Sequence, residues 1–441
     1  MQDEPTMLFF SHLGSPADGE NPPPFLIGVP GNHEFDEGYD ELMRLLNGGT
    51  HENGPFLIDP WPGVSFPCIC ANVVDTRSHE PVFPPFVIDT VENVRIAYIG
   101  AVTAHTPGIV SPGGISKLSF TDEATAINRA AQTCVAQGVR AIVAIVHEGG
   151  AQRSCSDTAT VTGVIAEIVK NLHPEIDVVI SGHSHRYTNG ILKNAGGEPV
   201  LVTQAFARGT AFGQTECGID RTSGDIVATS SRIVTVRADS PAGPPPDSAV
   251  AALVQQARER VEPLTRRIVG STAHAIRRSP APSGESALGN LVADAQRAAM
   301  NADIALMNPG GIRADLDSGS ITWGELYTIQ PFNNYLVKMD LSGQSIRELL
   351  IDQWRGQPYA RLLSVSGLSY AWDGSMPPNK RVHDIRVDGT PLHPDSMYSV
   401  VVNSFLADGG DNFARLTTGG NRRSGPVDIE AMVTYIKAMA G

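Results

Sequence analysis

Two short stretches of the chain decide its predicted fold: Gly31-Asn32-His33-Glu34-Phe35-Asp36 and Gly182-His183-Ser184-His185. Each begins with glycine and follows an apolar run, which is typical of a turn at the end of a buried strand. Histidine and asparagine side chains are suitable ligands for divalent cations such as Zn²⁺ and Mn²⁺. We therefore expect both stretches to contribute to one metal site.

A third stretch has the same character, because His147 follows the apolar run 141–146 and precedes two glycines. The carboxyl ends of neighbouring parallel strands meet at one edge of an open α/β sheet, so these three turns are predicted to converge. A single histidine at a strand end is more often structural or merely exposed, but three such turns in this order favour metal binding. The histidines without this context are interpreted as structural or exposed: His12, His51, His79, His105, His173, His274, His383 and His393.

The bulk composition describes a globular protein with more than one domain. The chain has 441 residues, 41% hydrophobic and 18% charged, and its net charge is −14. No run of lysine and arginine forms a basic stripe, so we do not expect binding to a nucleic-acid polymer. The five cysteines are too few and too scattered for a disulfide framework. No apolar run is long enough for a transmembrane helix.

The first half of the chain alternates strand and helix patterns. The apolar runs 96–100, 141–146 and 178–180 predict buried strands, and 122–137 and 158–172 predict helices, the first with Thr121 as its N-cap. This alternation predicts a layered α/β domain over residues 1–238, with helices outside the sheet.

A second domain is predicted after a linker. Residues 239–268 begin with a proline-rich segment and continue as a connecting helix from residue 249. Residues 269–441 then contain a helix from Glu285 and a strand over 398–403. Within them, Asn308-Pro309-Gly310-Gly311-Ile312-Arg313 follows an apolar run. Its glycines allow close approach of a ligand, and its arginine is suited to phosphate, although an exposed turn arginine is the simpler alternative.

On these motifs the chain resembles the 5′-nucleotidase family of calcineurin-like metallophosphoesterases, which also includes 2′,3′-cyclic phosphodiesterases. The resemblance implies an α/β metallophosphoesterase sandwich domain followed by an α/β 5′-nucleotidase C-terminal domain. It implies two divalent ions, such as Zn²⁺, Mn²⁺, Mg²⁺ or Ca²⁺. It makes Asn32, His147 and His183 ligands of one ion and His185 a ligand of the other.

The resemblance also implies roles for the remaining site residues. His33 stabilises the transition state and can protonate the leaving group, and Asp36 orients it; an acid at a helix start is the alternative for Asp36, and both roles can hold together. In the second domain, Arg313 binds substrate, Phe405 stacks on the nucleobase and Asp411 bonds the ribose hydroxyls. Less specific matches make Trp372, or else Tyr370, the second aromatic ring that stacks on the nucleobase with Phe405. They make Arg361 a second arginine that faces phosphate. Asn333 and Asn334 are expected to shape the site, whereas Phe332 is expected in the core.

The chain departs from the family pattern at its start. The family's metal site begins with an Asp-x-His string and a Gly-Asp pair, and neither occurs among the 30 residues before Gly31. We therefore expect an N-terminally truncated chain that lacks its first strand or strands, with one metal site incomplete and activity impaired.

The expected reaction is hydrolysis of a nucleoside 5′-monophosphate to nucleoside and phosphate. One alternative is a nucleotide-binding remnant without turnover. Another is a related phosphoesterase acting on cyclic nucleotides or UDP-sugars. The resemblance implies an extracellular or periplasmic location. The residues after Met1 do not resemble a secretion signal, so a cytoplasmic location is expected if Met1 is the true start.

Overall fold

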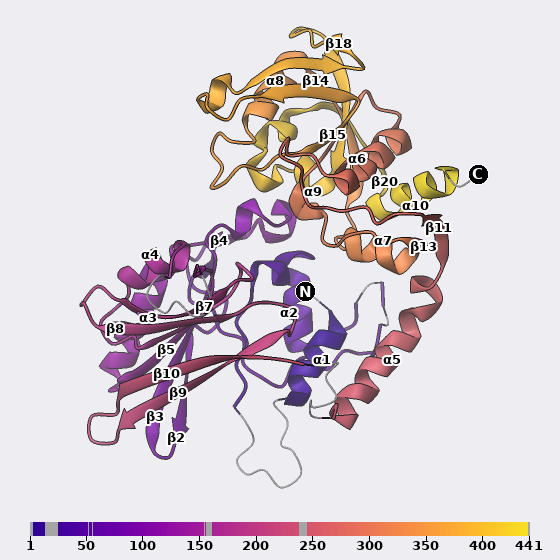
Figure 1. Cartoon of the computed structure of the whole chain (residues 1–441). Helices are drawn as coiled ribbons and strands as arrows, with labels where there is room; N and C mark the ends of the chain where they lie inside the picture. The colour runs from indigo at the N-terminus through magenta and orange to yellow at the C-terminus, as the bar shows by residue number, and fades with distance from the viewer. Residues whose placement is uncertain are drawn as a thin grey trace. The chain divides into compact units, whose positions relative to one another are not determined.

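The computed structural model describes residues 3–13, 25–51, 53–54, 56–153, 155, 161–237 and 245–439. It divides the chain into two compact units, Met1–Val254 and Gln255–Gly441, which are described separately below (Figure 1). The division falls within helix α5 (Ser248–Thr265), which has no buried residue. Most of the predicted proline-rich segment, residues 238–244, lies outside the described residues. Within the described ranges, no helix combines the length and the apolar character needed to cross a bilayer.

The first unit is built on a six-stranded sheet. Its four inner strands run parallel, and an antiparallel strand closes each edge. Val102 pairs with His147, and Val146 pairs with Ser181, so the carboxyl ends of three neighbouring strands align. In order across the sheet the strands are β2 (Phe86–Val91), β3 (Val94–Val102), β5 (Ala141–His147), β6 (Val178–Ser181), β8 (Pro199–Ala205) and β7 (Tyr187–Lys193).

The two faces of this sheet are covered differently. Alternate side chains of β5 point to opposite faces, as strand geometry requires. Ile142 and Ala144 pack with helices α3 (Glu123–Ala136) and α4 (Val164–Lys170). Ala141 and Val143 instead pack with Ile219 and Ile226, which come from the hairpin of β9 (Ala211–Asp220) and β10 (Asp225–Thr235). The predicted helices therefore cover one face, and a β-hairpin covers the other.

The apolar run 25–29 does not form the strand that was expected before Asn32. It makes one isolated parallel bridge, between Gly28 and Cys68. The next ladder bonds on either side would need the N–H groups of Pro30 and Pro67, and proline has none. Paired prolines therefore limit this pairing to one residue.

Helix boundaries also differ from the predictions in detail. Helix α3 is capped by Asp122, whose side chain accepts a hydrogen bond from the N–H of Thr125, and not by Thr121. Helix α4 begins after Gly163, later than predicted, and residues 156–160 lie outside the described residues. The other elements of this unit are α1 (Glu4–Leu13), η1 (Asn32–Phe35), α2 (Tyr39–Asn47), β1 (Val73–Asp75), η2 (Thr106–Gly108), η3 (Pro112–Ile115) and β4 (Leu118–Phe120).

The second unit is a five-stranded sheet between two helical layers. Leu288 and Val292 of one helical layer pack with Ala305 and Val401 of the sheet, whereas Ile304 packs with the opposite layer. The strands in order are β15 (Ser364–Ser366), β12 (Ile304–Met307), β19 (Met397–Asn403), β14 (Tyr335–Ser342) and β20 (Gly420–Val427). The first layer holds α6 (Ala287–Met300), α7 (Trp323–Ile329) and α10 (Asp428–Met439), and the second holds α8 (Gly343–Ile351) and α9 (Ser404–Ala407).

Smaller elements complete the second unit. The predicted helix from Glu285 begins at Ala287, because Ser286 caps it by accepting a hydrogen bond from the N–H of Gly289. The smaller elements are β11 (Ile268–Thr272), η4 (Pro309–Gly311), β13 (Gly319–Thr322), β16 (Leu368–Trp372), η5 (Pro378–Lys380), β17 (Val382–Val387), β18 (Thr390–Pro391), η6 (Gly410–Asn412) and η7 (Ala414–Thr418).

Helix α10 begins with a buried acid, which gives the unit a pH-dependent stability. Asp428 is 2% exposed, and burial raises its pKa to about 7. Between about pH 4 and pH 7 the folded chain holds a proton that the unfolded chain has released, so stability falls as pH rises. We expect this group to contribute a slope of at most about 1.4 kcal/mol per pH unit across that window.

Asp428→Asn should remove this slope while preserving the side-chain oxygen that accepts from the N–H of Ile429. Urea unfolding followed by near-UV circular dichroism at pH 5 and pH 8 measures the change. Asp384→Asn, at an exposed aspartate of the same unit, is the matched control and should leave the slope unaltered. An Asp428→Asn variant with the wild-type pH dependence would contradict the assignment.

Candidate functional site

Three predicted metal ligands come together at one edge of the first unit's sheet. His147 is the last residue of β5, and His183 follows β6 after Gly182. Asn32 opens the short helix η1. Its side-chain oxygen Oδ1 lies 3.1 Å from His147 Nε2 and 3.1 Å from His183 Nδ1. Three turns far apart in sequence therefore place three potential donors around one point.

Glycine is required beside this cluster. A Cβ atom on Gly31 would lie 2.6 Å from the imidazole ring of His147, which is closer than real Cβ contacts allow. The backbone before Asn32 can therefore approach the His147 ring only because residue 31 has no side chain.

Burial keeps both imidazoles of the cluster neutral. Burial and, to a smaller extent, the charge of the neighbouring His183 together lower the pKa of His147 to about 4. Burial also lowers the pKa of His183. A neutral imidazole has a nitrogen lone pair available, whereas an imidazolium has none, so the protonation states suit metal binding.

The three donor side chains suit one divalent ion, although they are fewer than the ligands that a complete coordination shell would need. Asn32 Oδ1 is 3.1 Å from each of the facing nitrogens of His147 and His183, and all three are atom types that would hold a divalent ion. Within the part of the chain that the structure describes, no group of three or more His, Cys, Asp or Glu side chains could hold a metal. The cluster reaches three donors through the amide oxygen of Asn32.

The turn that carries His183 and His185 is held in a strained conformation. Both histidines have a positive backbone φ, at 65° and 57°, which residues other than glycine rarely adopt. Ser184 between them is anchored, because its hydroxyl donates to the carbonyl oxygen of Gly150 at 2.6 Å and accepts from Gln204 Nε2 at 2.8 Å. His185 is close enough for its charge to affect His147.

His33 and Asp36 form a pair beside the cluster. His33 Nδ1 lies 2.7 Å from Asp36 Oδ2. The charge of His33 lowers the pKa of both His147 and His183. Helix α2 begins at Tyr39, after Gly38, so Asp36 is not in its first turn. The alternative of an acid at a helix start therefore does not describe Asp36, which closes η1 instead.

Two residues that sequence reasoning passed over also act on the cluster. Glu148 is buried next to the end of β5, and its charge raises the pKa of His183. The charge of His105 lowers the pKa of His183. His105 comes shortly after the end of β3 and is exposed, which is one of the two alternatives expected for it from the sequence.

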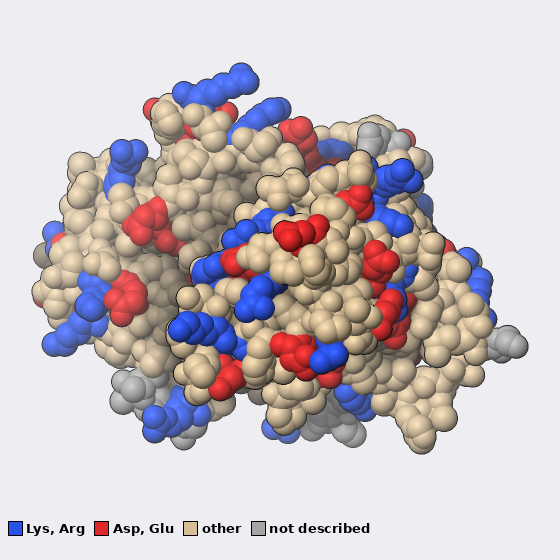
Figure 2. Space-filling view, turned by 90° about the horizontal axis from the view of Figure 1, so that it is seen from above, with Lys and Arg blue, Asp and Glu red and all other residues tan. Residues whose placement is uncertain are grey.

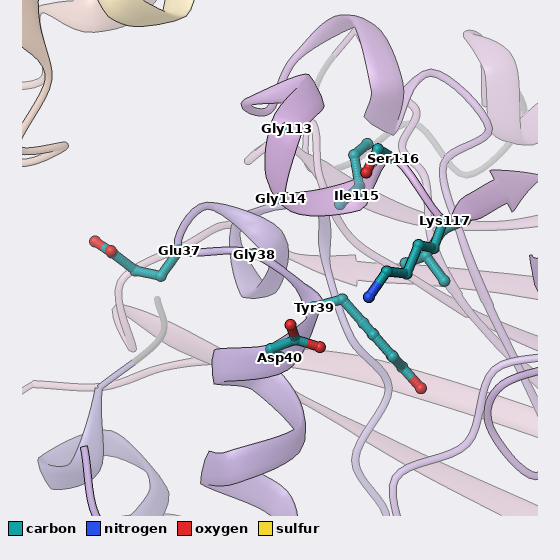
Figure 3. Close-up of a pocket in the computed structure, with 10 residues that line it drawn as sticks. Glu37, Gly38, Tyr39, Asp40, Gly113, Gly114, Ile115, Ser116 and Lys117 are labelled. Carbon is teal, nitrogen blue, oxygen red and sulfur yellow. The ribbon is translucent and has the colours of Figure 1, made fainter. Parts of the chain in front are cut away.

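A small hollow adjoins the segment after Asp36 (Figure 3). It is lined by residues 37–40 and 113–118, where Gly38 and Gly114 approach so closely that a Cβ on Gly114 would lie 2.7 Å from Gly38 Cα. Figure 3 shows Tyr39, Asp40 and Lys117 along this hollow and the Glu37 side chain pointing away. Its lining includes none of the predicted metal or catalytic residues.

In the second unit, Asp411 lies at the centre of a buried polar network. Its Oδ1 is 2.9 Å from Arg361 Nη1, and its Oδ2 accepts a hydrogen bond from Asn308 Nδ2 at 2.8 Å. Asn308 in turn accepts from Asn403 Nδ2, and Gln357 donates to the backbone oxygen of Asp411. The resemblance led us to expect Arg361 to face phosphate, but its observed partner is Asp411.

Phe405 is held next to this network. Its half-buried ring packs on Gly410, where a Cβ would lie 2.5 Å from ring atoms. Ser404 donates to Asn334 Oδ1 at 2.9 Å, so Asn334 anchors the start of α9. Asn333, beside it, is exposed and has positive φ.

Arg313 and Phe332 contact each other. The Arg313 guanidinium lies 5.8 Å from the Phe332 ring centroid, and its Nη1 donates to Gly310. Phe332 is half-buried, so the expectation that it belongs to the core is wrong.

The predicted partner aromatics have other contacts. Trp372 donates from its indole nitrogen to Ser283 and packs on Trp354. The hydroxyl of Tyr370 bonds Gln353, and its ring packs on the core. A stacking role for either ring stays a prediction.

Comparison with known proteins identifies the family. The family model of the 5′-nucleotidase C-terminal domain matches residues 268–418. Endonuclease YhcR of Bacillus subtilis is 39% identical over 99% of this chain, and cell wall protein Lmo0130 of Listeria monocytogenes is 32% identical over 99%. The chain spans only 34% and 58% of these two relatives.

A solved structure agrees over most of both chains. The crystal structure of a 5′-nucleotidase precursor from Thermus thermophilus is 30% identical, with a TM-score of 0.78 over 94% of this chain and 81% of that one. This agreement confirms the predicted α/β fold class, a metallophosphoesterase domain followed by a C-terminal nucleotidase domain. The chain therefore belongs to the 5′-nucleotidase family of phosphoric ester hydrolases.

Proposed function

We propose that this chain hydrolyses nucleoside 5′-monophosphates to nucleoside and phosphate with a divalent cation. The observation that carries the proposal is the convergence of Asn32, His147 and His183 beside the His33–Asp36 pair. The similarity to a 5′-nucleotidase precursor over 94% of the chain supports the substrate class.

Asn32, His147 and His183 are the residues that would hold one cation, and His185 would contribute to a second. A bound divalent cation neutralises charge on phosphoryl oxygens and assists the attack of water. Because both buried imidazoles are neutral, they need lose no proton to bind it.

His33 supplies a proton and a hydrogen bond in this proposal. With both ring nitrogens protonated it would donate from Nδ1 to Asp36 and from Nε2 to a phosphoryl or leaving oxygen. The Asp36 carboxylate holds the ring orientation and stabilises the imidazolium.

The second unit would hold the nucleoside. Phe405 would stack on the base, Asp411 would accept from the ribose hydroxyls, and Arg313 would bind phosphate. Trp372 and Asn334 remain candidates at this site, as partner ring and as support for Phe405.

We also propose the organisation and location implied by the resemblance. Domain limits of 1–238, 239–268 and 269–441 are supported by a unit boundary inside the connecting helix and by a family-model match that begins at residue 268. A cell wall protein among the relatives supports an extracellular location.

Phosphate release from AMP, 2′,3′-cyclic AMP and a UDP-sugar, measured with Mn²⁺ or Zn²⁺, tests the reaction. We expect release from AMP and much less from the other two. If no substrate is hydrolysed while adenosine still binds, the chain is a nucleotide-binding protein without turnover.

A second candidate is phosphodiester cleavage, because the relative that is 39% identical is named an endonuclease. On the face shown in Figure 2, acidic and basic side chains are interspersed and form no basic stripe, which favours a small substrate. Cleavage of bis(p-nitrophenyl) phosphate and single-stranded DNA, with AMP left intact, would favour this second candidate.

Metal analysis tests the cation site directly. We expect about one tightly bound Zn²⁺ or Mn²⁺ per chain, because one ion has three donors from the described residues. His183→Ala should weaken binding more than about 100-fold, since losing a ligand costs more than losing an outer partner. His79→Ala, at an exposed histidine of the same unit, is the control. Unchanged binding in His183→Ala, measured by mass spectrometry after dialysis, would contradict the site.

His33→Asn should lower kcat for AMP by about 10²–10⁴-fold with little change in KM, because it removes the proton donor and leaves the nucleoside contacts. Asp36→Asn should lower kcat less. His79→Asn should match wild type. A His33→Asn variant with wild-type kcat would exclude the assigned role.

A further inference from the structure

Arg361 is a charged side chain in an unusual environment. Its side chain is 7% exposed, and its Nη1 lies 2.9 Å from Asp411 Oδ1 without favourable hydrogen-bond geometry. Its guanidinium carbon also lies 5.2 Å from the ring centroid of Tyr359. Burying a charge is costly unless a partner compensates it, so the arginine and the aspartate depend on each other.

The Asp411 carboxylate is held from several directions. Asn308 donates to Oδ2, Gln357 donates to the backbone oxygen, and the residue has a positive φ of 56°. Each carboxylate oxygen therefore has one protein partner and retains acceptor capacity. A Cβ on Gly310 would lie only 3.8 Å from Oδ2, so the glycine turn before Arg313 runs beside this oxygen.

Two adjacent acceptor oxygens in a fixed orientation match two adjacent hydroxyl donors. We propose that Arg361 is a positioning residue that, with Asn308, fixes Asp411 as a two-oxygen acceptor selecting nucleosides with a ribose 2′,3′-diol. This inference rests on the proposed nucleoside-binding role of Asp411. It gives Arg361 a part in sugar selection, through Asp411, in place of direct contact with phosphate.

The charges around Asp411 support the assignment. Burial raises the pKa of Asp411, whereas Arg361 and Asn308 oppose that rise. Other charged groups on the neighbouring elements pair among themselves: Asp408 with Arg422, and Asp352 and Glu348 with Arg355 and Arg415. Among the described charged groups, Arg361 is therefore the cation that favours the ionised form of this carboxylate.

Calorimetric titration with adenosine and 2′,3′-dideoxyadenosine tests the inference. Wild type should bind adenosine more tightly. Arg361→Met should weaken adenosine binding by about 10–100-fold and dideoxyadenosine binding by less than about twofold, because the lost hydrogen bonds involve a charged acceptor. Arg361→Lys should be intermediate, and Arg386→Met, at a more exposed arginine paired with Asp384, should match wild type.

The pH profile separates positioning from general structural damage. Without Arg361 the pKa of Asp411 should rise further, so adenosine affinity should be lost at a higher pH than in wild type. If Arg361→Met folds poorly, Arg361→Met/Asp411→Asn removes both charges and should bind adenosine as Asp411→Asn does. Additive losses in that double variant would overturn the inference.

The outcomes distinguish this inference from the proposed function. If Arg361→Met keeps the wild-type preference for adenosine and the wild-type pH profile, while wild type hydrolyses AMP, only the inference fails. If wild type neither binds adenosine nor hydrolyses AMP, the proposed function fails and the inference fails with it.

Discussion

The parallel register of β3, β5 and β6 is the constraint on which the first unit's site depends. Pairing of Val102 with His147 and of Val146 with Ser181 brings the strand ends to one edge. The turns that follow must then project into the same space. Asn32 reaches that space from a different direction, because proline prevents a strand before it and leaves one bridge at Gly28.

Each unit buries polar groups that an apolar core would normally exclude. The two units offset the free-energy cost of that burial in different ways. In the first unit, neutral imidazoles surround an amide oxygen, which lowers the cost of burial and leaves donors for a cation. In the second, a guanidinium and a carboxylate offset each other's charge, and neutral amides complete the hydrogen bonding. Both arrangements hold polar side chains at fixed positions within their unit.

Strongly patterned segments were predictable from sequence, whereas features that depend on distant partners were not. The buried strands over 141–146 and 178–180 and the helix over 122–137 have local signals and form nearly as expected. The run 25–29 has a similar apolar signal, but its pairing depends on where Pro30 and Pro67 fall relative to each other. Phe332 is a second example, because its contact with Arg313 joins two segments that are separated in the sequence.

The family could be identified from the sequence through the resemblance of its motifs, and the α/β class followed from hydrophobic periodicity, because both are local properties of the chain. The positions of Asn32 Oδ1 beside two imidazoles and of Arg361 beside Asp411 became visible only in the folded chain. Those contacts join residues far apart along the chain. Their geometry follows from sheet register and burial, which no local pattern encodes.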